Sequence, residues 1–158
     1  METMPVITLA LLAFPEGILA PSLGLVLLGQ KPRLKTAVLI GLIYMVGAFI
    51  ARRLLLYGLH SIGLLVLVVF IILHFYNLPL KAACAASIIA YAFIILGESL
   101  TLPSFMRIFS VTIEEILADT WLRVAASLPN QILLLLVFCC TYYIRGFHKK
   151  NTKNMLIN

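Results

Sequence analysis

The chain has 158 residues, of which 63% are hydrophobic and only 11% charged, and its mean hydropathy is +1.10. So few charged side chains cannot cover the surface of a soluble domain of this length, and the composition therefore predicts an integral membrane protein. The 12 Lys and Arg residues outnumber the 6 Asp and Glu residues. Most of these basic residues stand at the ends of apolar runs, so we interpret them as topology signals and expect no nucleic-acid partner.

The apolar runs predict about five membrane spans, because a helix needs about 20 mostly apolar residues to cross a bilayer. The predicted spans are residues 5–29, 34–51, 57–76, 80–102 and 128–144. We therefore predict an all-α, polytopic helical bundle in the cell membrane, with a transmembrane domain over residues 1–147 and a short basic tail over residues 148–158. The first residues, Met-Glu-Thr-Met-Pro, lack the positive charge that begins a signal peptide, so we expect the first span to stay in the mature protein.

Glu16 lies in the middle of the first predicted span. An acidic side chain near the centre of a spanning helix costs about 2.5–3.5 kcal/mol, so its presence indicates either an ion pair or a function. The preceding residue, Pro15, has no backbone N–H. It leaves the carbonyl of Leu11 without its usual helical partner, which predicts a kink or a polar group bound at that carbonyl.

Further ionisable residues fall on the same half of the predicted bundle as Glu16, namely Arg52, Arg53, His60 and Glu98. One interpretation is a structural ion pair between either carboxylate and either arginine, since opposite charges lower the cost of burying each other. The other is a polar pocket that binds a ligand, with an arginine for an anionic group and a carboxylate or His60 for a cation or a proton. The sequence leaves both interpretations open, and it does not decide which arginine takes part.

Small residues recur at intervals of four in the fourth predicted span, at Ala82, Ala86 and Ala90, and Ala13 and Gly17 repeat the pattern in the first span. Small side chains at this spacing let helix backbones approach closely. We interpret these stripes as packing surfaces within the chain, with a homodimer as the alternative.

A different kind of segment follows the fourth span, which we expect to end at Pro103. Thr112 and Glu115 have the spacing of a capping box, which predicts the start of a helix. The apolar positions over residues 112–127 then follow helical spacing, so we predict an amphipathic helix in the membrane interface with Trp121 at headgroup level. The alternative is the start of a long, tilted last span; Pro129 favours a break or a kink.

The distribution of basic residues predicts an N-terminus outside and a cytoplasmic C-terminus. With that orientation eight basic residues lie inside, Lys31, Arg33, Lys35, Lys81, Arg145, Lys149, Lys150 and Lys153, and four lie outside, Arg52, Arg53, Arg107 and Arg123. We expect the tail lysines, Lys149, Lys150 and Lys153, to attract anionic lipids of the inner leaflet by about 1 kcal/mol each. Contact of the tail with a cytoplasmic partner is the alternative.

The sequence contains no metal-binding His-Glu-x-x-His, no Gly-x-Ser-x-Gly, no glycine-rich phosphate loop and no Cys-x-x-Cys. We therefore predict a protein without catalytic residues, metal or cofactor.

The chain resembles the N-terminal membrane regions of sensor histidine kinases of Firmicute type and short stand-alone relatives of those regions. The residues that carry the resemblance are Pro15-Glu16, Leu27-Leu28-Gly29-Gln30-Lys31-Pro32 with Lys35, Arg52 or Arg53 before Gly58-Leu59-His60, Leu78-Pro79-Leu80-Lys81-Ala82, and Glu98. The resemblance implies sensing or relaying a signal, such as a peptide or envelope cue.

No phosphoacceptor-histidine helix or ATP-binding domain follows Ile144, so we expect signalling to require a protein partner. The candidate partners are a kinase, a response regulator or a second copy of the chain, besides the lipid bilayer. The alternative function is a small permease or the substrate-binding membrane subunit of a transporter, whose partner is then another transporter subunit.

Overall fold

The computed structural model describes the backbone of residues 6–54 and 59–155 and the side chains of residues 7–8, 10–54 and 59–145. Within these ranges the chain forms six helices and is all-α, as the sequence predicted. The helices are α1 (Val6–Leu27), α2 (Leu34–Leu54), α3 (Leu59–Tyr76), α4 (Leu80–Phe109), α5 (Ile113–Ala118) and α6 (Thr120–Met155).

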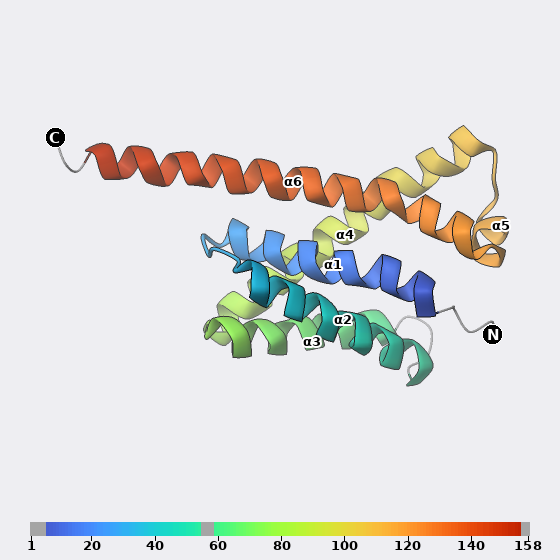
Figure 1. Ribbon diagram of the computed structural model, residues 1–158, viewed down its shortest axis with the longest axis horizontal. Coiled ribbons are helices and arrows are strands. Elements are labelled where there is room, and N and C mark those ends of the chain that lie inside the picture. Colours follow the sequence, from blue (N-terminus) through green and yellow to red (C-terminus); the bar gives the residue numbers. More distant parts are fainter. Residues whose placement is uncertain (1–5, 55–58, 156–158) are drawn as a thin grey trace.

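α1 is the central helix of the bundle, since it packs against α2, α4 and α6 (Figure 1). α3 packs against α2 and α4, and α4 crosses α6. Successive long helices run in alternating directions from α1 to α4, whereas α6 runs in the same direction as α1 and projects with its C-terminal part beyond the other helices (Figure 1). α1 therefore contacts three of the other four long helices.

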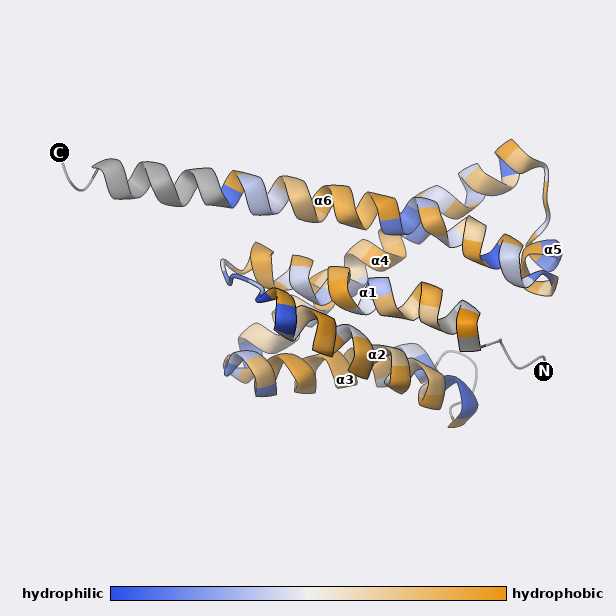
Figure 2. Ribbon diagram, viewed as in Figure 1, coloured by the Kyte–Doolittle hydropathy of each residue, from blue (hydrophilic) through white to orange (hydrophobic). Residues whose placement is uncertain are grey.

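Five of the six helices are long and apolar enough to cross a membrane. The apolar stretches are Ala10–Leu27, Leu34–Leu54, Leu59–Tyr76, Leu80–Phe109 and Thr120–Arg145. Hydrophobic residues make up most of these helices, and hydrophilic residues gather at several helix ends and turns (Figure 2). Large apolar side chains such as Phe70 and Leu96 are 66% and 60% exposed. A surface of such side chains is suited to contact with lipid and not with water. The chain is a polytopic membrane protein.

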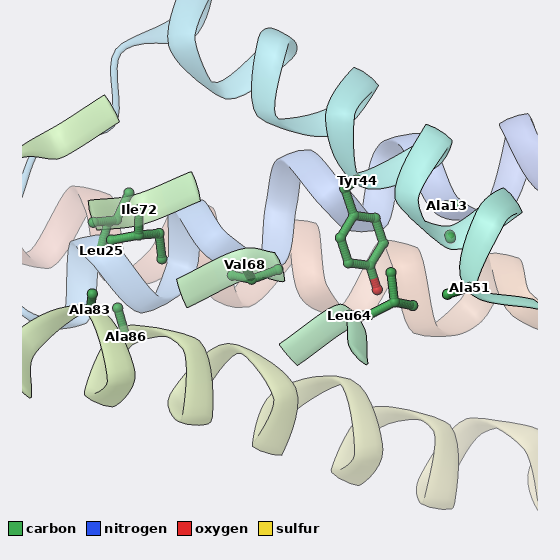
Figure 3. Close-up of a cluster of buried hydrophobic side chains, with 10 residues drawn as sticks. Ala13, Leu25, Tyr44, Ala51, Leu64, Val68, Ile72, Ala83 and Ala86 are labelled. Atoms are coloured by element: carbon green, nitrogen blue, oxygen red, sulfur yellow. The ribbon is translucent and has the colours of Figure 1, made fainter. Parts of the chain in front are cut away.

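The interior of the bundle is built largely from small and branched residues. Ala83 and Ala86 of α4 are fully buried and pack with Leu25 of α1 and with Val68 and Ile72 of α3 (Figure 3). Of the predicted alanine stripe in α4, Ala86 and Ala90 are buried, as expected for packing within the chain, and Ala82 is partly buried.

α1 and α4 cross most closely at Gly24. A Cβ atom added at Gly24 would collide with the backbone carbonyl of Ala86. The crossing therefore depends on the missing side chain, and no other residue type fits without moving the two backbones apart.

α4 does not end at Pro103, as the sequence predicted, but continues to Phe109. A proline removes one backbone hydrogen bond, and neighbouring helices make this tolerable within a membrane. Beyond the proline, Phe105 is buried against Ile116 and Ala126. This contact with the following helices, which no local pattern reveals, holds the last turns of α4 in place.

The capping box at Thr112 is confirmed: its hydroxyl accepts a hydrogen bond from the Glu115 N–H at 3.3 Å, and Glu115 accepts one from the Thr112 N–H at 2.7 Å. The prediction of one amphipathic helix over residues 112–127 was wrong, however. α5 ends at Ala118, and the Asp119 carboxylate accepts hydrogen bonds from the Trp121 and Leu122 N–H groups at 2.7 and 3.0 Å.

No break occurs at Pro129, because α6 runs as one helix from Thr120 through Pro129 to Met155. The alternative of a long last span that starts before residue 128 is therefore the one that the structure shows. The residues after the proline face other helices, with Asn130 against α4 and Gln131 against α1. Trp121 therefore lies in the first turn of the last long helix, 67% exposed.

Candidate functional site

The partly buried Glu16 carboxylate of α1 has a hydrogen-bond partner in α2. The Tyr44 hydroxyl donates to Glu16 Oε1 at 2.7 Å, and Tyr44 itself is only 3% exposed. The neighbouring Gly17 makes this approach possible, because a Cβ atom there would lie 2.7 Å from Tyr44 Cβ. In Figure 3 the Tyr44 ring points into the bundle toward Leu64. The contact therefore joins two spanning helices and is partly buried between them.

Two further charged side chains act on Glu16 through space. One is the Glu98 carboxylate of α4 and the other is the Arg52 guanidinium of α2, which also acts on Glu98. One guanidinium thus partly balances two carboxylates, which lowers the cost of keeping all three groups within membrane helices.

Tyr91 of α4 completes this group of residues. Its hydroxyl is shielded from solvent and interacts with Tyr44 and Glu16, but it meets full hydrogen-bond geometry with none of the described residues. We call Glu16, Tyr44, Arg52, Tyr91 and Glu98 the polar cluster. A phenol hydroxyl that lacks a well-aligned partner beside a carboxylate is suited to bind a further polar group.

The remaining two predicted site residues lie near the ends of neighbouring helices. The Arg53 guanidinium stacks over the Phe49 ring, 4.3 Å from its centroid, which is a cation–π contact. His60 is in the first turn of α3, partly buried, and its Nε2 is 3.4 Å from the Ser61 hydroxyl. The two adjacent arginines therefore have different surroundings, which the sequence alone did not distinguish.

These surroundings predict that Arg52, and not Arg53, is coupled energetically to Glu16. In a double-mutant cycle with Glu16→Gln, the Arg52→Gln change should show an interaction energy above about 0.5 kcal/mol, the usual size for residues that share a network. Arg53→Gln is the matched control and should add to Glu16→Gln without interaction. Chemical unfolding in detergent measures both cycles. Equal coupling of the two arginines, or none for either, would contradict this assignment.

Pro15 leaves the Leu11 carbonyl without a helical donor. A polar side chain lies within hydrogen-bond distance of this carbonyl, as the sequence predicted. Gln131 Nε2 of α6 lies 3.2 Å from the Leu11 carbonyl oxygen and 3.4 Å from that of Leu12. α1 itself continues as a helix through Pro15. The turn that carries Glu16 is therefore bound to α2 on one side and to α6 on the other.

The neighbouring Asn130 faces α4. It is 6% exposed, and its Oδ1 lies where a Cβ atom of Gly97 would be. This oxygen has no hydrogen-bond partner among the described residues. A side chain at Gly97 would therefore require the Asn130 amide to move.

Sequence reasoning missed Tyr44, Tyr91 and Gln131 as members of the site. A signal existed, because tyrosine and glutamine within spanning helices need partners for their polar atoms. The pairings were not readable, since Glu16 and Tyr44 are 28 positions apart and Gln131 and Leu11 are 120 apart.

The predicted membrane-surface lysines, Lys149, Lys150 and Lys153, lie in the last turns of α6, where the side chains are outside the described residues. Arg145 shows how this end of α6 is attached to the bundle: its guanidinium donates a hydrogen bond to the carbonyl of Leu27 at the end of α1. A cation there also interacts favourably with the negative end of the α1 dipole.

Comparisons of the chain with known protein families, with curated proteins and with solved structures find no match. The function must therefore be argued from the polar cluster and its connections.

Proposed function

We propose that this protein is a non-enzymatic membrane subunit that senses a signal or regulates a partner through the polar cluster. The observation that carries the proposal is the hydrogen bond between Tyr44 and Glu16 in the middle of two spanning helices. Ionisable residues at this depth are costly, and they mark ligand sites, ion paths or proton relays in membrane proteins. Packing alone does not need them, because apolar residues of the same volume would pack as well.

The composition of the polar cluster indicates the ligands to test. Glu16 and Glu98 suit a cationic or protonated group, Arg52 suits an anionic group, and the Tyr91 hydroxyl suits either. An amino acid or a short peptide carries both charges. The resemblance of the chain to membrane regions of sensor kinases supports the same class of ligand.

The proposed orientation places the N-terminus outside and the C-terminus in the cytoplasm, as the basic residues predict. The end of the bundle with the N-terminus of α1 and the C-terminus of α2 then faces outward, and α6 ends inside (Figure 1). A fluorescent protein fused to the C-terminus should be protected from an external protease; its digestion in intact cells would reverse the orientation. A kinase, a response regulator or a second copy of the chain is the proposed partner on the inner side.

One observation favours a small permease, or a transporter subunit with its own partner subunit, as the second candidate. Next to the polar cluster, Pro15 interrupts the hydrogen-bond ladder of α1, and transporters often place interrupted helices beside their substrate sites. A permease would release what it binds on the other side of the membrane, whereas a sensor would not.

The experiment is thermal unfolding of the purified full chain in detergent, with a panel of amino acids, short peptides, small anions and pH values. A ligand that binds only the folded protein adds about 2.7 kcal/mol of stability at a hundred times its dissociation constant. We expect at least one compound to raise the unfolding midpoint of the wild type but not that of Glu16→Gln. The control is Glu114→Gln, which neutralises an exposed carboxylate on α5 and should leave the response intact.

If no compound raises the midpoint, or if Glu16→Gln responds like the wild type, the polar cluster is not the sensing site. Uptake of a stabilising compound into proteoliposomes then separates the two candidate functions. Uptake supports the permease, and binding without uptake supports the sensor.

A further inference from the structure

One turn of α1 contacts the two helices that a signal from the polar cluster would have to connect. On one face of this turn, Glu16 accepts the hydrogen bond from Tyr44 of α2. On another face, the carbonyl oxygens of Leu11 and Leu12 lie within hydrogen-bond distance of the Gln131 amide of α6. A change at Glu16 therefore acts on a segment of backbone that α6 also holds.

The reason for the second contact is chemical. In an uninterrupted helix the N–H of residue 15 would donate to the Leu11 carbonyl, and proline has no N–H to donate. The Gln131 side chain supplies the missing donor from another helix. An unsatisfied carbonyl within the membrane costs several kcal/mol, so α1 and α6 are held together at one of the two positions, Pro15 and Pro21, where a proline interrupts the α1 ladder.

The second attachment between these helices lies at the opposite end of α1. There the Arg145 guanidinium of α6 donates to the Leu27 carbonyl. The two helices run in the same direction, and α6 continues toward its basic end, which projects beyond the other helices (Figure 1).

We propose that Gln131 is the positioning residue that couples the polar cluster to α6. Loss or neutralisation of charge at Glu16 shifts the Pro15 turn, and the Gln131 contact passes that shift to α6. This inference rests on the proposed function, since it names the route by which the polar cluster would regulate a partner at the end of α6.

The test measures the position of α6 by pulsed electron resonance between two spin labels in the full chain. One label is attached to the native Cys140 on α6, which is free and exposed. The other is attached at Val66→Cys, an exposed position of α3, which packs on α2 and α4. The changes Cys84→Ala and Cys139→Ala remove the other thiols.

With Gln131 present, Glu16→Gln should shift the distance peak by about 1–2 Å, the size of helix shifts between functional states. With Gln131→Leu, the same Glu16→Gln change should leave the peak where it is. Thr141→Val is the matched control on α6, because among the described residues the Thr141 hydroxyl donates to carbonyls of its own helix alone. This control should preserve the shift.

Pro15→Ala keeps the test valid if Gln131→Leu alone does not fold, since alanine restores the N–H that pairs with Leu11. Gln131→Leu should therefore lower the unfolding midpoint less in the Pro15→Ala chain than in the wild type, and equal losses would show that Gln131 does not replace the missing donor. The peak of the distance between the two spin labels is then measured again in the Pro15→Ala chain.

A Glu16→Gln shift that is absent, or that persists without Gln131, overturns the coupling. The measurement uses no ligand, so its failure is distinct from that of the proposed function, which depends on a stabilising compound.

Discussion

Replacing Gly24 by alanine is expected to destabilise the bundle by about 3 kcal/mol, which is the upper end of the usual cost of overpacking. The added Cβ atom would collide with the carbonyl group of Ala86, and a backbone group cannot rotate away as a side chain can. α1 and α4 would have to separate along their crossing and lose contacts between Leu23 and Ala90. Unfolding of the purified chain by denaturing detergent measures the loss.

Gly47→Ala is the matched control, because it adds the same methyl group to a spanning helix of the same bundle. The atom it would meet is the far end of the Leu67 side chain, which can move to another rotamer. We expect a cost below about 1 kcal/mol, within the range that cores tolerate after repacking. If the two substitutions cost the same, the α1–α4 crossing does not depend on Gly24.

Tyr44→Phe is expected to cost about 1.5–3 kcal/mol, the contribution of a hydrogen bond to a charged group. The change removes the donor and leaves the Glu16 carboxylate within the bundle without that partner. The double variant Glu16→Leu/Tyr44→Phe should recover most of the loss, because replacing both partners of a buried polar pair by apolar groups is often close to neutral. The same unfolding measurement applies.

Tyr142→Phe serves as the control for this cycle, since Tyr142 lies on the exposed part of α6 and removal of its hydroxyl should change stability by less than about 0.5 kcal/mol. A double variant as unstable as Tyr44→Phe alone would mean that the tyrosine hydroxyl stabilises the bundle through some group other than Glu16. If Glu16→Leu/Tyr44→Phe is stable but no longer responds to a ligand that stabilises the wild type, the hydrogen bond serves function more than folding.

In the polar cluster, some features follow from the local sequence and others depend on how the helices pack. The cost of Glu16 in an apolar run and the missing N–H of Pro15 are local properties, so both could be recognised from the sequence, and a polar partner for Leu11 was expected. The partners themselves could not be named. Several polar side chains lay in other spans, and only the packing of α2 and α6 on α1 places Tyr44 and Gln131 at the two faces of one turn.

Helix boundaries show the same division. Apolar length and the Thr112 capping box depend on neighbouring residues alone, and they located the five spanning helices and the start of α5. Pro103 was expected to end a helix and Pro129 to break or kink one, because proline weakens the ladder locally. Contacts between distant segments decided otherwise: Phe105 packs on α5 and α6, and Gln131 reaches α1. Another helix can compensate for the backbone hydrogen bonds that a proline removes. The local sequence does not reveal which helices pack against each other.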